Sequence, residues 1–167
     1  MDNFNIDDYA MDEEKYSKDI QKCDQVFVYG TLKTGGEIRG LNNMGLNVNP
    51  KGKANTSYSD YEMIDLGAFP GLLKGNSTII GEVWELDEEA LYALDGMEGF
   101  ERNNLPVDWK APNFGDHIKG NFYSRTLIQT SQGKAWIYFL DEQTYGKYRD
   151  LESNNIEKVD NTLIWHN

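Results

Sequence analysis

The chain has 167 residues, of which 39% are hydrophobic and 13% aromatic, enough for one domain with a buried core. Its formal net charge of −12 gives an acidic surface that repels phosphate backbones, so nucleic-acid binding is not expected. The sequence shows neither a signal-peptide pattern nor an apolar run of the roughly 18 residues that a membrane helix needs, so we expect a cytoplasmic protein.

Residues 1–24 differ from the rest in composition, with eight acidic residues, three lysines and scattered aromatics such as Tyr16. This composition fits either a loose acidic arm or a short helix packed on the domain. We expect an at least half-ordered extension, because its aromatics could dock. The single cysteine, Cys23, excludes an internal disulfide, and beside Asp24 it is expected to be an ordinary free thiol rather than a nucleophile.

The first half of the domain is predicted to contain three strands. Val26–Tyr29 is a short β-branched and aromatic run that Gly30 ends, so it is predicted to be a buried strand. Residues 33–57 are rich in polar residues and glycine and are predicted to be mostly loop. Residues 58–64 and 79–86 are the next strands, separated by the turn-forming segment 67–71.

A helix is predicted after Asp87, whose side chain suits an N-cap, with Leu91 and Leu94 at helical spacing. Gly96 and Gly99 are expected to end it. Residues 100–121 are predicted to be irregular.

The last part of the chain is predicted to contain a β-hairpin formed by residues 122–130 and 134–140, followed by a surface helix within 141–152. The apolar tail at 163–165 should pack back on the domain. This strand-rich order with few helices indicates an α+β fold with a barrel-like or mixed sheet.

The segment from Tyr29 to Gly36 is one candidate binding loop. A strand that runs into Gly30–Thr31 exposes successive backbone N–H groups, which can hold a carboxylate or a polarised carbonyl oxygen. Taken alone, the segment is better explained as a tight turn after a strand. It lacks the Gly-Lys-Ser/Thr ending of a phosphate-binding loop, so that function is not expected.

Glu98 is the candidate base, because a carboxylate at the electronegative end of a helix among apolar neighbours should have a raised pKa. The alternative is an exposed acid in a helix-end loop. Asp95, Glu98 and Glu101 could also form a cation site, although such a run more often marks a solvated face. His117 and His166 lack metal-ligand spacing, so no metal site is expected.

These segments together resemble the γ-glutamylcyclotransferase-like superfamily, which includes γ-glutamylamine cyclotransferases and AIG2-like proteins. The matching blocks occur in family order over roughly residues 26–140. They are Val26–Lys33, Leu66–Leu72, Gly81–Asp87, Leu94–Gly99, and the closing hairpin with Tyr123–Arg125 and Ala135–Tyr138.

The resemblance implies a small mixed β-barrel with flanking helices and a cavity at one end. It implies that Glu98 is the proton acceptor and that no metal or organic cofactor takes part. It also implies a small-molecule γ-glutamyl substrate, bound by Tyr29, Gly30, Thr31, Leu32 and Tyr123.

The implied reaction is attack of the substrate's own α-amine on its γ-carbonyl, which releases 5-oxoproline and a free amine or peptide. The domain is expected to span 25–167, with an insertion at about 100–122 that separates Glu98 from Tyr123. This insertion and the extension at 1–24 are where a protein partner could bind. The alternative function is a non-catalytic small-molecule binding or regulatory module on the same fold.

Overall fold

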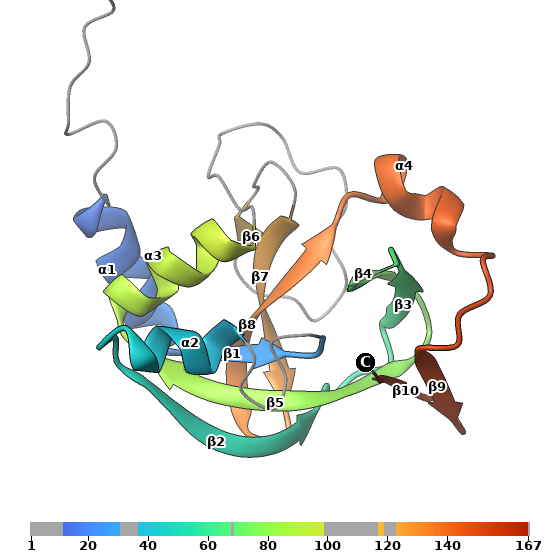
Figure 1. The fold of residues 1–167 in the computed structure, drawn as a ribbon, viewed down its shortest axis with the longest axis horizontal. Coiled ribbons are helices and arrows are strands. Elements are labelled where there is room, and N and C mark those ends of the chain that lie inside the picture. The colour runs from blue at the N-terminus through green and yellow to red at the C-terminus, as the bar shows by residue number, and fades with distance from the viewer. Residues whose placement is uncertain (1–11, 31–36, 68, 99–116, 119–122, 167) are drawn as a thin grey trace, which may run out of the picture.

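The computed structural model describes residues 12–30, 37–67, 69–98, 117–118 and 123–166 (Figure 1). Its helices are α1 (Glu13–Lys22), α2 (Glu37–Asn43), α3 (Glu88–Met97) and α4 (Glu142–Tyr145), followed by a 3-10 turn at Gly146–Tyr148. Its strands are β1 (Gln25–Val28), β2 (Val48–Asn55), β3 (Tyr61–Asp65), β4 (Pro70–Lys74), β5 (Thr78–Leu86), β6 (His117–Ile118), β7 (Tyr123–Thr130), β8 (Gly133–Leu140), β9 (Ile156–Val159) and β10 (Thr162–Trp165).

One large mixed sheet forms the centre of the molecule. Its strand order is β6-β7-β8-β1-β5-β10-β9, and β2 also pairs with β5. Strand β1 is antiparallel to β5 and parallel to β8, so both of its edges are covered inside the sheet. The β3–β4 hairpin forms a separate two-stranded sheet. The α+β class and the mixed sheet predicted from the sequence are therefore confirmed.

The sheet curls, but it does not close into the expected barrel along its length. Near the turn between β7 and β8, Thr56 and Thr130 form an isolated bridge. The Ser57 N–H donates to the Gln129 carbonyl at 2.9 Å, and the Ser131 N–H donates to the Asn55 carbonyl at 2.9 Å. Among the described residues, these contacts join the end of β2 to the end of β7 and the turn that follows it, and they do not continue along the two strands.

Two hydrophobic clusters fill the two sides of the sheet. The first contains side chains from α1, α2 and α3, and these three helices lie together at the left of Figure 1. The second lies with the β3–β4 hairpin and β10. Val83 belongs to the second cluster and the next residue, Trp84, to the first, as expected for a strand with both faces buried.

Helix α3 forms where the sequence predicted it. The Asp87 carboxylate accepts the Ala90 N–H at 2.9 Å and caps the helix. Leu91 and Leu94 are fully buried, while Glu89 on the opposite side is exposed. The helix continues through Gly96 to Met97 and has Glu98 as its C-cap residue. A capped amphipathic pattern therefore fixes where this acid lies relative to the sheet.

The prediction that residues 33–57 are mostly loop was wrong, because they contain α2 and β2. Each element buries only a few apolar side chains, such as Ile38 and Leu41 on α2, within an otherwise polar segment. Strand β2 is also interrupted by a register shift between Pro50 and Gly52, which hides its alternation.

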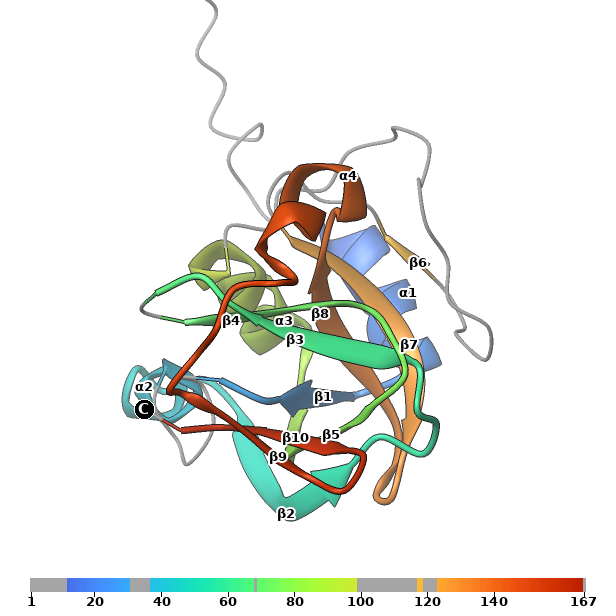
Figure 2. The same ribbon diagram turned by 90° about the vertical axis from the view of Figure 1, so that its right-hand side faces the viewer.

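The end of the chain follows the prediction in part. The surface helix expected within 141–152 is only the short α4 and the 3-10 turn. The apolar tail does pack back on the domain, since Leu163 and Trp165 of β10 are buried. Figure 2 shows the chain running from α4 past the β3–β4 hairpin to the hairpin of β9 and β10.

Candidate active site

The end of β1 brings Tyr29 and Gly30 against the start of β4. The Tyr29 side chain is buried, and its hydroxyl donates to the Tyr138 carbonyl at 2.7 Å. A Cβ atom at Gly30 would lie 2.7 Å from both Cγ and Cδ of Pro70, so only glycine permits this close approach. Thr31 and Leu32, the other predicted loop residues, lie outside the described residues.

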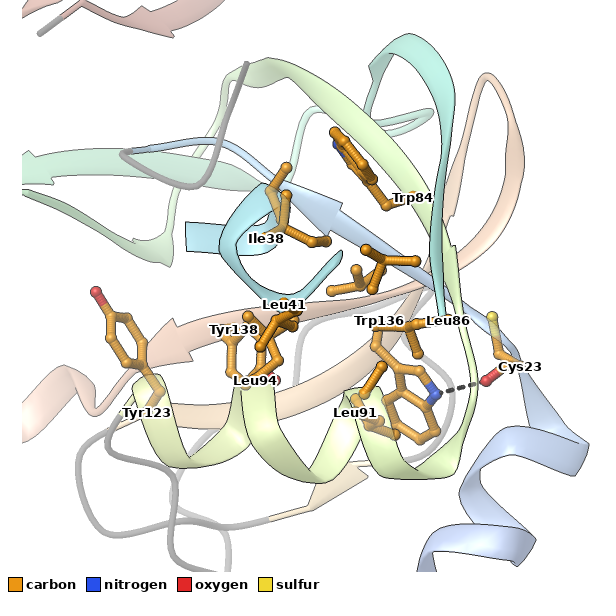
Figure 3. Close-up of a cluster of buried hydrophobic side chains, with 14 of the residues drawn as sticks. Cys23, Ile38, Leu41, Trp84, Leu86, Leu91, Leu94, Tyr123, Trp136 and Tyr138 are labelled. Atoms are coloured by element: carbon orange, nitrogen blue, oxygen red, sulfur yellow. Dashed lines mark hydrogen bonds between the residues drawn. The ribbon is translucent and has the colours of Figure 1, made fainter. Parts of the chain in front are cut away.

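Tyr123 reaches the same place from the start of β7. Its hydroxyl donates to the Pro70 carbonyl at 3.0 Å, and its ring meets the Tyr138 ring edge-to-face at 6.1 Å. Figure 3 shows Tyr123 and Tyr138 beside α3, in the same cluster as Leu94. The structure therefore brings Tyr29 and Tyr123 together through Pro70 and Tyr138, although they are far apart in the sequence.

The hydroxyl protons of Tyr29 and Tyr123 are both used by backbone carbonyls. Burial raises the pKa of Tyr29 well above its usual value, and the neighbouring Tyr123 and Glu98 raise it further. The phenol thus stays neutral at physiological pH. With its proton donated within the protein, a phenol oxygen can offer a ligand only its lone pairs. Such oxygens suit a ligand that donates, for example an ammonium group.

Glu98 lies at the C-terminal end of α3, where its backbone N–H donates to the Leu94 carbonyl at 2.9 Å. Its side chain is half-buried. Burial and Asp95 raise the pKa of the Tyr138 phenol, and the charge of Glu98 adds to this effect, as it does for Tyr29. Glu98 is therefore close enough to act on both phenols electrostatically. Of the predicted site residues, the structure gathers Glu98, Tyr29, Gly30 and Tyr123 at one end of the sheet.

Asp95 is the other acid near the C-terminal end of this helix, and its carboxylate is fully hydrogen-bonded. One carboxylate oxygen accepts from Arg125 Nε at 3.0 Å and from the Tyr138 hydroxyl at 2.5 Å. The other oxygen accepts from Arg125 at 2.9 Å and from the Tyr16 hydroxyl at 2.6 Å. With four donors on its two oxygens, Asp95 has no acceptor position left for a substrate proton.

Two interpretations of Asp95 from the sequence were therefore wrong, namely a solvated face and a cation site. Asp95 is buried and paired with a guanidinium, so its charge is already matched. Within the described part of the chain, no group of three or more metal-ligating side chains is found. Glu98, three residues further on, is the acid whose charge acts on Tyr29 and Tyr138.

Sequence reasoning missed Arg125 as a buried residue. Its side chain has no exposed surface, and its guanidinium lies 4.7 Å from the centre of the Trp136 ring. One signal was present, because Asp95 follows Leu91 by four residues and so lies on the apolar stripe of α3. A carboxylate in that position requires a buried cation or several donors.

Cys23 shows no sign of nucleophilic activation. The thiol is buried, and its Sγ donates to the Lys134 carbonyl at 3.2 Å. Burial raises the pKa of the Cys23 thiol, and the adjacent Asp24 adds to the increase, so little thiolate exists at neutral pH.

The described helices include none long and apolar enough to cross a membrane.

At the end of β1, the structure thus brings together a closely packed glycine, buried tyrosines and a half-buried acid, the residue types expected at a candidate site for a small polar molecule. The family model described as gamma-glutamyl cyclotransferase, AIG2-like, matches residues 26–158 of this chain. The chain therefore belongs to this family, as the resemblance of its motifs indicated. Helix α1 lies before the matched range and β10 after it.

Curated relatives agree with this assignment. The chain is 30% identical over 123 residues to the gamma-glutamylcyclotransferase family protein ytfP of Citrobacter rodentium, covering 73% of this chain and 86% of that protein. It is 34% identical over 117 residues to a Vibrio cholerae protein provisionally named a gamma-glutamylcyclotransferase, covering 70% of this chain and 82% of the relative.

A solved structure from the same group is also similar. The solution NMR structure of protein ytfP from Escherichia coli has 29% sequence identity and a TM-score of 0.44, covering 70% of this chain and 82% of that one.

Proposed function

We propose that this protein is a γ-glutamyl cyclotransferase that converts a γ-glutamyl amine or peptide into 5-oxoproline, with Glu98 as the general base. Membership of the family supports the chemical class. The observation that carries the proposal is the difference between Asp95 and Glu98, the two acids at the C-terminal end of α3. Asp95 is saturated by four donors, whereas Glu98 is half-buried and its charge raises the pKa of Tyr29 and Tyr138. The saturation of Asp95 therefore supports Glu98 as the proposed base.

The proposed reaction needs one base and no external nucleophile. The substrate's α-ammonium group loses a proton to Glu98, and the freed nitrogen attacks the γ-carbonyl carbon. A new C–N bond closes the five-membered ring, and the C–N bond to the leaving amine breaks. Glu98 returns the proton to the leaving nitrogen, and the second proton on the ring nitrogen is released to water, which leaves a neutral lactam. Because the attack is intramolecular, the protein mainly has to hold the substrate in a folded conformation and stabilise the developing oxyanion.

The tyrosines fit the charge of such a substrate. The Tyr29 oxygen has given its proton to the Tyr138 carbonyl and can accept from the α-ammonium, and Tyr123 lies next to it through Pro70 and Tyr138. The backbone that follows Gly30, with Thr31 and Leu32, is proposed to hold the glutamyl carboxylate or carbonyl through its N–H groups. No metal or organic cofactor is needed for these steps.

The test is to incubate the purified protein with a panel of γ-glutamyl amines and peptides, including γ-glutamyl-ε-lysine, and to measure 5-oxoproline. Glu98→Gln should lower kcat/KM by about 10²–10⁴-fold, because the general base is lost. Glu89→Gln is the matched control, since Glu89 is an exposed acid in the first turn of the same helix. It should retain the activity of the wild type.

Two results would contradict the proposal. One is a Glu98→Gln variant as active as the wild type. The other is a wild-type protein that binds one γ-glutamyl compound per chain without forming 5-oxoproline. That result would instead identify a non-catalytic binding module.

A further inference from the structure

A buried ion-pair network ties α1 to the helix that carries Glu98. Arg125 of β7 donates to both oxygens of Asp95 on α3, at 3.0 and 2.9 Å. The same guanidinium donates to Asp19 of α1 at 3.1 Å. The side chains of all three charged residues are almost completely buried. Burial opposes the guanidinium charge, but Asp95, Tyr138 and Asp19 outweigh it and raise the pKa of Arg125 above its usual value. The cation is therefore permanent.

Helix α1 contributes two side chains to this network. Tyr16 and Asp19 are three residues apart, so they lie on the same face of the helix. The Tyr16 hydroxyl donates to Asp95 at 2.6 Å, and its ring packs edge-on against Tyr92 of α3 at 5.4 Å between centroids. Both residues of α1 are buried. Helix α1 thus contacts α3 through a hydrogen bond, through a shared guanidinium and through aromatic packing.

The network is connected to the candidate site by two routes. Along α3, Asp95 precedes Glu98 by three residues, and the Glu98 N–H is still bonded to the Leu94 carbonyl within the helix. Across the sheet, the Tyr138 hydroxyl donates to Asp95, while the Tyr138 carbonyl accepts from Tyr29. A movement of Asp95 would therefore move the acid and disturb a neighbouring tyrosine.

We propose that Tyr16 and Asp19 of α1 are positioning residues, which hold the Asp95–Arg125 pair in place and thereby set the position of Glu98 relative to Tyr29 and Tyr123. This inference rests on the proposed function of Glu98 as the base. It assigns a part in the reaction to a helix that precedes the range matched by the family model. Neither residue needs to touch the substrate.

The first test uses Tyr16→Phe, which removes one hydroxyl and leaves the net charge unchanged. Two quantities are measured: the hydrogen-exchange rate of the Glu98 amide, and kcat and KM separately for 5-oxoproline formation. We expect exchange about tenfold faster, because the last turn of α3 is less well held. We also expect kcat to fall about tenfold with KM within about twofold, because the base is misplaced while binding groups remain. Tyr58→Phe, at a more exposed tyrosine, is the control.

The second variant is Asp19→Asn, compared with Glu14→Gln, which removes one negative charge from an exposed position of the same helix. Asp19→Asn should change both quantities in the same direction as Tyr16→Phe, and Glu14→Gln should change neither. The proposal is overturned if both positioning variants keep the wild-type Glu98 exchange rate and kcat, even when their unfolding temperature falls. If Glu98→Gln is fully active, the proposed function fails instead, while the exchange rate of the Glu98 amide still tests the positioning.

Discussion

At the scale of single residues, the contact between Gly30 and Pro70 brings the end of β1 next to the start of β4 at the candidate site. The hydrogen atom of Gly30 faces the proline ring, and Pro70 in turn supplies the carbonyl that accepts the Tyr123 hydroxyl. A glycine here is required by packing against a neighbour, and it does not have a positive φ angle. The same kind of close approach occurs at Gly71, where an added Cβ would lie 2.1 Å from Leu140.

Gly30→Ala should therefore destabilise the protein and disturb the site at once. The added methyl group must displace the Pro70 ring, and overpacking of this kind costs about 1–3 kcal/mol. Urea unfolding measures the free-energy change. Gly40→Ala in α2 is the control, because nothing lies within 4 Å of its added Cβ, and alanine is a better helix former. A Gly30→Ala variant as stable as Gly40→Ala would show that Pro70 can move without cost.

At the scale of elements, the β3–β4 hairpin is held against the segment that follows α4. The Asp65 carboxylate at the end of β3 accepts from Ser153 at 2.5 Å and from Asn155 at 3.1 Å. It also accepts the Gly67 N–H at 2.7 Å, which fixes the turn that leads to Pro70. The C-terminal segment therefore supports the hairpin whose Pro70 packs against Gly30 and accepts the Tyr123 hydroxyl.

The link through Asp65 should depend on pH. Burial would raise the pKa of Asp65, but the hydrogen bonds from Ser153, Gly67 and Asn155 outweigh it, so the pKa lies below its usual value. A depressed carboxyl pKa stabilises the fold above the unfolded value of about 3.9 and loses this effect as pH falls through the folded value. The difference in unfolding free energy between wild type and Asp65→Asn should thus be largest near pH 7 and shrink below about pH 4.

Urea denaturation at several pH values measures this difference. Asp150→Asn, at an exposed position, is the control and should show little difference at any pH. A difference for Asp65→Asn that stays constant from neutral to acidic pH would contradict the assignment.

At the scale of the whole molecule, a net charge of −12 makes self-repulsion a general feature of the folded state. Sodium chloride shortens the Debye length from about 30 Å at 0.01 M to about 10 Å at 0.1 M, so it should reduce this repulsion. We expect the unfolding temperature at pH 7 to rise between these concentrations. Solubility should be lowest near the isoelectric point of about 4.5. A falling unfolding temperature would mean that exposed ion pairs outweigh the general repulsion.

Much of the fold could be predicted because its signals are local. The alternation of β5, the cap at Asp87 and the glycine turn between β7 and β8 each depend on a few adjacent residues. Helix α2 and strand β2 were missed because their burial comes from partners elsewhere in the chain. Burial of Ile38 and Leu41, for example, requires the cluster formed by the other helices and the sheet.

The candidate site could be predicted in part, because some of its signals are also local. The loop at Tyr29 and the acid Glu98 carry motifs that can be recognised locally. What distinguishes Glu98 from Asp95 is not local, since the donors to Asp95 come from α1, β7 and β8. Arg125 itself pairs with an acid 106 residues away. The sequence alone therefore does not show that every acceptor position of the Asp95 carboxylate is taken by a hydrogen bond.

Cys23 has a practical consequence as a chemical reporter. It is the chain's single thiol, and it lies at the junction of α1 and β1. Its N–H is bonded to Asp19, and its carbonyl accepts the Trp136 indole N–H at 3.0 Å (Figure 3). A water-soluble alkylating reagent can reach this buried sulfur only when the junction opens. The labelling rate of native protein therefore counts how often α1 detaches, without any probe having to be added to the sequence.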